Sequence, residues 1–290
     1  MSLSWVPEIS KEQISRHADG VGESVIFRKF PGEINSPYHY SELQDEAFYL
    51  EKEKENLLSY FHSRGLQISL LHQNEEDFEG VLTYLNNRYD SSHAQEICAF
   101  DLYRFIEFGY GLLLKDRNSR IVGTIFEVFY DTAIPSAFTI RLSIDESLHG
   151  YNLGHKLMKY SCLLSMEKGI KVKRAIIEIN NSISLHVNLN KTGWICEGYL
   201  PKVPGLGSFF KISLPLSPYG LETNTVDKEV ITSFLLKKRK GIDYQLIPFL
   251  DEKSLARLYA ETDFFIVSFI PSGWIGEEAA YLAVPRDKLN

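Results

Sequence analysis

Two neighbouring segments decide the fold of this chain: Phe138-Thr-Ile-Arg-Leu-Ser-Ile144 and, after it, the turn His149-Gly-Tyr-Asn-Leu-Gly154. Apolar residues alternate along the first segment, which predicts a strand with one buried face. After the turn, apolar residues recur at helical spacing until Lys168-Gly169, where a cation and a glycine are typical of a helix end. The apolar run at residues 175–179 predicts the next strand. A helix that begins directly after a glycine turn presents unpaired N–H groups, which predicts a site for a phosphate-bearing ligand.

The stretch resembles the acyl-coenzyme A (CoA) binding region of the GNAT acyltransferase superfamily, in which a strand, a Q/R-x-x-G-x-G/A turn and a helix follow one another. His149 stands where Gln or Arg is usual in that family, and Asn152 stands where the middle glycine is usual. Asparagine is the non-glycine residue that best tolerates a positive φ. The backbone path of the turn is therefore expected to survive the change.

A second signature follows at the end of the stretch. The segments Asn181-Ser-Ile-Ser184 and Asn190-Lys-Thr-Gly-Trp194 resemble the family pattern N-x-x-A/S ahead of x-K-x-G-F. The family commonly places a Tyr that protonates the leaving thiolate four residues before this glycine, and that position here is Leu189. His186, one turn earlier, could replace it as the acid or could be a partly exposed helix residue. If neither group serves, the thiolate leaves unassisted, since thiols are acidic enough for that.

The resemblance implies transfer of an acyl group, expected to be acetyl, from the CoA thioester to a primary amine. It assigns to the strand end near Leu142 the backbone N–H groups that face the thioester carbonyl. The positions that it implies for binding the coenzyme are Leu142, Ser143, Ile144, His149, Gly150, Tyr151, Asn152, Leu153, Gly154, His155, Asn181 and Ser184.

Glu127 is the candidate general base. It lies among large apolar residues in Ile125-Phe-Glu-Val-Phe129, and burial would raise its pKa toward neutrality. If the preceding turn is centred on Ile134, Glu127 instead lies opposite Arg141 and forms a cross-strand ion pair. Both interpretations stay open at the level of sequence.

The predicted fold class is α/β: a GNAT-like, mixed but mostly antiparallel twisted sheet flanked by helices, with N- and C-terminal extensions. The divisions are residues 1–65, a helical extension; 66–217, the GNAT-like acyltransferase domain; and 218–290, a C-terminal α/β extension. Residues 42–62 predict one or two helices, which serve either as a packing extension or as a lid or dimer arm over the acyl site. The Lys237-Lys-Arg-Lys240 run is either a nucleic-acid patch or a solvated helix end.

Composition limits the function classes. The 290-residue chain has a formal net charge of -7, which disfavours nucleic-acid binding and is compatible with cationic amines. No N-terminal signal or membrane-length apolar run is present, so a cytoplasmic protein without a membrane partner is expected. The three cysteines, Cys98, Cys162 and Cys196, are interpreted as reduced core thiols. The eight histidines lack metal-ligand spacing, so no metal is expected.

The sequence thus predicts a GNAT-type N-acyltransferase that uses acetyl-CoA as co-substrate, with an amine of a small molecule or a protein as acceptor. One alternative is a non-catalytic acyl-CoA-binding or scaffolding protein, motivated by His149, Asn152 and Leu189. Another is a GNAT core in which the C-terminal segment fills the acceptor pocket or forms a homodimer interface.

Overall fold

The computed structural model describes residues 46–72, 75–88, 98–130, 133–203, 207–216, 226–236 and 243–286. The first half of the described chain contains α3 (Glu46–His62), β1 (Gln67–Leu70), α4 (Glu75–Arg88), α5 (Ala99–Phe108), β2 (Gly109–Lys115), β3 (Ile121–Tyr130), β4 (Ser136–Ile144) and the 3-10 turn η1 (Glu146–Leu148). Then follow α6 (Leu153–Glu167), β5 (Val172–Glu178), α7 (Ser182–Leu185), the π-helix η2 (His186–Lys191), β6 (Ile195–Val203) and β7 (Gly207–Pro215). The last elements are α8 (Lys228–Leu236), β8 (Gln245–Pro248), α9 (Glu252–Glu261), β9 (Phe264–Ile270) and β10 (Ala280–Pro285).

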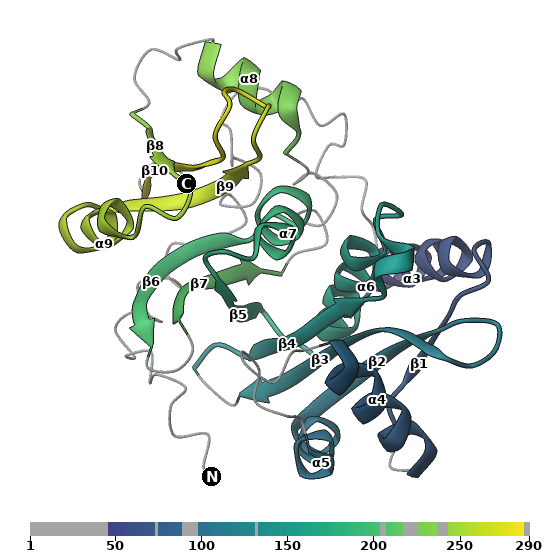
Figure 1. The fold of residues 1–290 in the computed structure, drawn as a ribbon. Helices are drawn as coiled ribbons and strands as arrows, with labels where there is room; N and C mark the ends of the chain where they lie inside the picture. Colours follow the sequence, from purple (N-terminus) through teal and green to yellow (C-terminus); the bar gives the residue numbers. More distant parts are fainter. Residues whose placement is uncertain are drawn as a thin grey trace.

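The described strands form one sheet in the order β1-β2-β3-β4-β5-β7-β6-β9-β10-β8 (Figure 1). Neighbouring strands are antiparallel except for β4 and β5, which are parallel. The predicted mixed, mostly antiparallel sheet flanked by helices is confirmed. Strands β2, β3 and β4 are antiparallel neighbours and precede helix α6 in the chain.

Helices cover both faces of the sheet, and strand β2 shows why. Successive side chains of a strand point to opposite faces. Leu113 packs with α4 and α5 in one hydrophobic cluster, whereas its neighbours Leu112 and Leu114 pack with α3 and α6 in the main core. Nearly every position of β2 and β3 is buried, since both faces are covered. Helix α6 is therefore held between the sheet and α3 (Figure 1).

The ends of α6 follow the sequence prediction. Asn152, immediately before the helix, has the left-handed conformation with φ 55°, and Gly169, after it, has φ 77°. The predicted apolar stripe is buried at Leu153 and Leu157 but only partly buried farther along. Ser161 and Ser165 occupy fully buried positions instead. The buried face is thus more polar than the apolar spacing indicated.

The C-terminal elements extend the same sheet. Strand β9 pairs with β6 at Cys196 and Ile266, and β10 and β8 continue outward from it. Helix α8 packs on β9 and β10 through a separate cluster that includes Ile231, Val267 and Leu282. The division of the chain at residues 65 and 217 stays a prediction.

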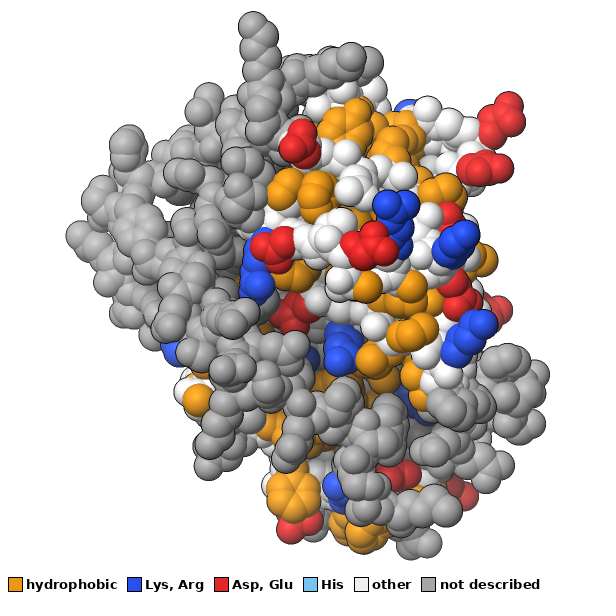
Figure 2. All heavy atoms as spheres, turned by 90° about the vertical axis from the view of Figure 1, so that its left-hand side faces the viewer, with side chains coloured by type: hydrophobic (Ala, Val, Ile, Leu, Met, Phe, Trp, Pro, Cys, Tyr) orange, Lys and Arg blue, Asp and Glu red, His pale blue; other side chains and the backbone are white. Residues whose placement is uncertain are grey.

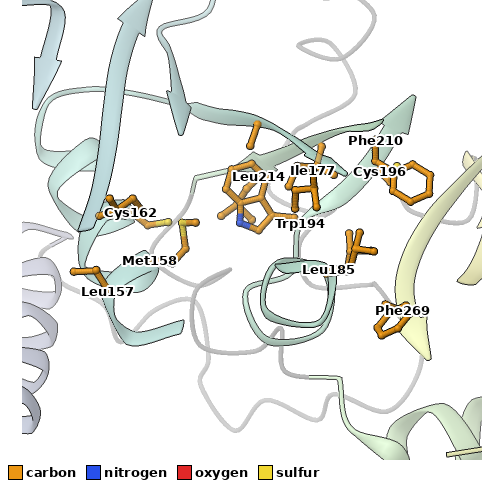
Figure 3. Packing of buried hydrophobic residues seen from close by; sticks show 14 of the residues in the cluster. Leu157, Met158, Cys162, Ile177, Leu185, Trp194, Cys196, Phe210, Leu214 and Phe269 are labelled. Carbon is orange, nitrogen blue, oxygen red and sulfur yellow. The ribbon is translucent and has the colours of Figure 1, made fainter. Parts of the chain in front are cut away.

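Trp194, the last residue of the second signature, lies in the main core. Its neighbours there include Ile177 of β5 and Leu214 of β7, and Met158 and Cys162 of α6 lie across the same cluster (Figure 3). The indole is fully buried, and its Nε1 has no hydrogen-bond partner among the described residues. The second signature therefore anchors its loop by burying a large aromatic side chain.

The surface, the helix lengths and the cysteines can be compared with what the composition predicted about nucleic-acid binding, membrane spans and thiols. On the face drawn in Figure 2, Lys and Arg side chains are scattered among Asp, Glu and hydrophobic side chains. No helix within the described ranges is long and apolar enough to cross a membrane.

All three cysteines are free, but Cys98 is exposed at the start of α5, so the prediction of a core thiol is wrong there. The Lys237–Lys240 run lies outside the described residues.

Candidate acyl-coenzyme A site

Strands β4 and β5 separate part of the way along the sheet. They are paired only at Ser136, Ala137 and Phe138 of β4. Beyond Phe138, β4 continues along β3 as far as Ile144, while β5 continues along β7. The facing edges of the two strands therefore leave backbone N–H and C=O groups without a strand partner in the described sheet. Leu142, Ser143 and Ile144 lie on this part of β4.

A β-bulge sets the direction of the end of β4. Arg141 has φ 54°, and the pairing with β3 shifts register between Thr124 and Phe126. The hydroxyl of Thr124 donates a hydrogen bond to the carbonyl oxygen of Arg141 at 3.2 Å. A non-glycine residue at positive φ is strained, and this side-chain contact helps to hold it. The bulge turns the backbone of the following residues relative to the regular ladder.

The turn after β4 is fixed by local contacts. Asp145 accepts hydrogen bonds from the backbone N–H and the hydroxyl of Ser147, at 3.0 and 2.7 Å. The Nε2–H of His149 donates to the carbonyl oxygen of Ile144 at 3.2 Å. His149, at the first signature position, thus ties the turn to the end of the strand.

The first turn of α6 has the features of an anion site. The side chain of Asn152 makes no capping hydrogen bond, while its backbone oxygen accepts from Lys156 at 3.0 Å. The first N–H groups of a helix have no partner within the helix. Those of Leu153, Gly154 and His155 therefore face the turn uncapped by Asn152, at the positive end of the helix dipole.

Cationic side chains surround this helix end. Burial, with Lys156, Lys159 and Lys191, lowers the pKa of His155 to about 4, so this imidazole is neutral near pH 7. Burial also lowers the pKa of Lys156, and the nearby Lys159 and Arg64 lower it further, while the carboxylate of Glu53 opposes the shift. Lys159 is paired with Glu53 at 2.8 Å, so the positive charge near the start of α6 comes from Lys156, Lys191 and Arg64.

The second signature begins a helix and lies near the first. Asn181 caps α7, since its Oδ1 accepts a hydrogen bond from the backbone N–H of Ser184 at 3.0 Å. The helix then continues as the π-helix η2, which contacts α6. Lys191 of η2 is close enough to His155 to affect its pKa. Leu189, at the position of the family Tyr, is fully buried in the main core.

His186 lies against the C-terminal part of the chain. Its Nδ1 accepts a hydrogen bond from the amide nitrogen of Asn190 at 3.2 Å, and its ring meets Trp274 edge-on at 5.8 Å. Burial and the charge of Lys191 lower its pKa. The imidazole is therefore neutral near pH 7, and this disfavours it as the acid that protonates a thiolate.

Glu127 belongs to a buried polar network. Its Oε1 lies 2.5 Å from Nζ of Lys173 and accepts from the hydroxyl of Ser161 at 2.7 Å. Its Oε2 accepts from the hydroxyl of Thr139 at 3.0 Å. Lys173 also donates to Ser161 at 2.7 Å, and neither charged side chain has exposed surface.

The prediction that Glu127 pairs with Arg141 is therefore wrong: Glu127 does form an ion pair, but its partner is Lys173. The β3–β4 ladder pairs Tyr130 with Ser136 and places Thr139 opposite Glu127. The ion-pair interpretation holds in another form, with Lys173 of β5. A base must reach the amine that it deprotonates, and the burial of Glu127 disfavours that role.

Sequence reasoning missed the partners of Glu127, although one signal was present. Lys173 shares the strand phase of Ala175 and Ile177, which are both buried. A lysine in phase with buried residues indicates a buried charge that needs a partner. By contrast, no local pattern marks Tyr60 of α3, whose hydroxyl donates to the carbonyl oxygen of Tyr151 at 2.5 Å.

Within the described residues, no group of three or more His, Cys, Asp or Glu side chains could hold a metal ion.

No family model matches this sequence, and no curated protein matches it. Among solved structures, it is similar to a chain of the NatC complex bound to Gag peptide and CoA, with 18% identity and a TM-score of 0.46 over 52% of this chain and 99% of that one. The ribosomal-protein-S5-alanine acetyltransferase of Vibrio fischeri gives 13% identity and a TM-score of 0.46 over 53% and 94% of the two chains. A GNAT family acetyltransferase of Elizabethkingia anophelis with acetyl-CoA bound gives 14% identity and a TM-score of 0.40, over 52% of this chain and 99% of that one. The mixed, mostly antiparallel sheet flanked by helices, together with the strand β4, the turn and the helix α6, gives the chain the GNAT-like fold that the resemblance implied.

Proposed function

We propose that the chain is an acyl-CoA-dependent N-acyltransferase that transfers an acyl group, in the first instance acetyl, to a primary amine. The observation that carries this proposal is the separation of β4 from β5 beyond Phe138, followed directly by the left-handed turn and the uncapped start of α6. An extended thioester arm fits the separated strands, and its phosphates fit the helix end. The amine belongs to a small molecule or, as the second class, to a protein.

The residues present suit a coenzyme with several phosphate groups. The N–H groups at the start of α6 are directed to the turn, and Lys156, Lys191 and Arg64 add positive charge around it. Anionic phosphates are stabilised by such N–H groups and by nearby cations. The coenzyme, when bound, supplies the activated acyl group as a thioester.

The chain stabilises the reacting carbonyl chiefly through its backbone. N–H groups of β4 near Leu142, Ser143 and Ile144 hydrogen-bond the carbonyl oxygen as negative charge develops on it. A C–N bond forms to the amine and the C–S bond breaks. The amine proton passes to water, because Glu127 is enclosed by Lys173, Ser161 and Thr139. The thiolate leaves without a protein acid, since a thiol pKa of about 8.5 makes it an adequate leaving group.

The first test is thermal unfolding with acetyl-CoA and, separately, with CoA. Ligand at 100 times its dissociation constant should add roughly 2.7 kcal/mol to the free energy of unfolding and raise Tm. Both ligands should act alike, since the proposed contacts of the turn are with the phosphates. An unchanged Tm at millimolar concentrations of either ligand would contradict the proposal.

Turnover with a panel of primary amines, measured as free thiol release, then tests catalysis. Release that depends on a particular amine supports the acyltransferase and identifies its acceptor class. Binding of both ligands without turnover on any amine would instead favour the non-catalytic acyl-CoA-binding alternative, which the burial of Leu189 and Glu127 motivates.

A further inference from the structure

Helix α3, in the N-terminal extension, runs antiparallel to α6. Near the middle of both helices, Glu53 pairs with Lys159 at 2.8 Å, and toward the C-terminal end of α6 Lys54 pairs with Glu167. At the opposite end, Tyr60 reaches the backbone of Tyr151, just before α6 begins. The C-terminal end of α3 is therefore adjacent to the turn of the candidate acyl-CoA site.

Tyr60 holds the turn from outside it. Its hydroxyl donates to the carbonyl oxygen of Tyr151 at 2.5 Å. Tyr151 lies between Gly150, with φ 87°, and Asn152, with φ 55°. Glycine adopts a positive φ freely, whereas the positive φ of Asn152 is strained and depends on contacts that hold the segment. The hydrogen bond from α3 is one such contact, and it joins elements 91 residues apart in sequence.

Two cations gather on the ring of Tyr60. The guanidinium carbon of Arg64 lies 3.7 Å from the ring centroid, and Nζ of Lys156 lies 5.3 Å from it. Within the described residues, neither cation has a carboxylate within ion-pair distance, whereas Lys159 is paired with Glu53. Arg64 instead donates to the carbonyl oxygen of Tyr60 and the hydroxyl of Ser63, at 3.2 and 3.1 Å. Positive charge from α6 and from the turn after α3 is thus placed at the start of α6, where the N–H groups are uncapped.

We propose that the C-terminal end of α3 and the turn that follows it form a functional wall of the coenzyme site, in which Tyr60 of the helix positions the phosphate-binding turn and Arg64, two residues beyond the helix, binds a phosphate group. This inference rests on the proposed acyl-CoA function and assigns a role to the N-terminal extension within it. Tyr60 acts through the turn and not on the reacting atoms. The phosphate is either the pyrophosphate or the ribose 3′-phosphate of CoA, which share the same charge chemistry.

The test compares the full-length chain with Tyr60→Phe, Arg64→Ala and Arg64→Lys. Lys52→Ala, on the exposed face of the same helix, is the matched control. Tyr60→Phe should raise the Kd for CoA about three- to tenfold, and Arg64→Ala should raise it about tenfold or more. Arg64→Lys should recover part of the loss, because the charge is restored without the planar guanidinium. The control should bind as the wild type does.

Three further measurements separate binding from general structural damage. Tm without ligand should fall little in the Arg64 variants, since that side chain is exposed. In turnover assays, Tyr60→Phe should raise KM for the acyl-CoA and leave kcat unchanged. Affinity of Arg64→Ala for CoA should fall less steeply with salt than that of the wild type, because one phosphate contact is missing.

Dephospho-CoA identifies the phosphate. If Arg64→Ala weakens CoA but not dephospho-CoA, Arg64 contacts the 3′-phosphate; equal weakening of both assigns it to the pyrophosphate. Equal affinity of the wild type, Tyr60→Phe and Arg64→Ala for CoA would overturn the inference and leave the proposed function intact. Failure of the wild type itself to bind CoA would overturn both.

Discussion

The carboxylate of Glu127 on β3 and the ammonium of Lys173 on β5 lie 2.5 Å apart across the intervening strand β4, and neither has exposed surface. Hydroxyl groups from β4 and α6 complete the contacts of the pair. A buried ion pair is expensive to form but far more expensive to leave half-formed. Removing one member of this pair should therefore lower the free energy of unfolding.

Glu127→Gln should lower the free energy of unfolding by roughly 3 to 5 kcal/mol, because it leaves the Lys173 ammonium buried without its counter-charge. Urea unfolding measures this difference. Glu261→Gln, which disrupts the exposed pair with Arg257, should cost less than about 1 kcal/mol. The double variant Glu127→Gln/Lys173→Met should be more stable than Glu127→Gln alone. Unchanged stability in Glu127→Gln would mean that the pair has no structural role.

Stability should depend on pH through His155. Its pKa is about 4 in the folded protein against 6.5 ordinarily, so the unfolded chain binds the proton more readily between those values. The contribution of His155 to the free energy of unfolding is therefore fully present above pH 6.5 and is lost as the pH drops through 4, by roughly 3 kcal/mol in total.

Comparison of urea midpoints of the wild type and His155→Asn across that range isolates this contribution from other titrating groups. The variant should show a shallower loss of stability toward low pH. Parallel curves would show that His155 does not carry the effect. Bound CoA should raise the pKa of His155 in an NMR titration, because phosphate charge favours the imidazolium form.

Asn152 should tolerate glycine better than alanine. Its φ of 55° lies in the left-handed region, where alanine costs roughly 1 to 2 kcal/mol and glycine carries no such penalty. Thermal unfolding should therefore place Asn152→Gly within a few degrees of the wild type and Asn152→Ala clearly below it. If both variants have the same Tm, the turn does not need its left-handed conformation at this position.

Asn190 should be essential for the attachment of the C-terminal strands. Its Oδ1 accepts from the hydroxyl of Ser268 at 2.8 Å and from the N–H of Phe269 at 3.0 Å, and its Nδ2 donates to the carbonyl oxygen of Phe269. Asn190→Ala leaves these buried groups unsatisfied, at a cost of roughly 2 to 4 kcal/mol. Hydrogen exchange should show the largest loss of protection in β9. Exchange that is unchanged there would contradict the role.

One cysteine of the three should react with a thiol reagent in the native state. Cys98 is exposed, whereas Cys162 and Cys196 are buried, and burial raises the pKa of Cys162 to about 11. Rapid modification should therefore consume one thiol per chain and disappear in Cys98→Ser. That variant is also the proper background for any assay of CoA thiol release. Rapid reaction of more than one thiol would contradict the buried positions.

Much of the fold could be predicted because it depends on local patterns. The alternation at residues 138–144 predicted the strand that corresponds to β4, and the apolar spacing and glycine end predicted α6. The left-handed conformation of Asn152 was also expected from its residue type. The predicted cross-strand partner of Glu127 was wrong, because the β3–β4 hairpin pairs Glu127 with Thr139 and not with Arg141. A small error in the position of a turn changes every cross-strand partner.

The sequence by itself determined the secondary elements, their order and the turn before α6, because hydrophobic period and residue conformation act within a few neighbouring residues. Only the tertiary structure decided that Lys173 neutralises Glu127, that Asn190 binds β9 and that Tyr60 of α3 holds the turn at Tyr151. These pairs are far apart in the chain. They meet because the sheet register and the antiparallel packing of α3 on α6 bring them together, and no local pattern encodes either.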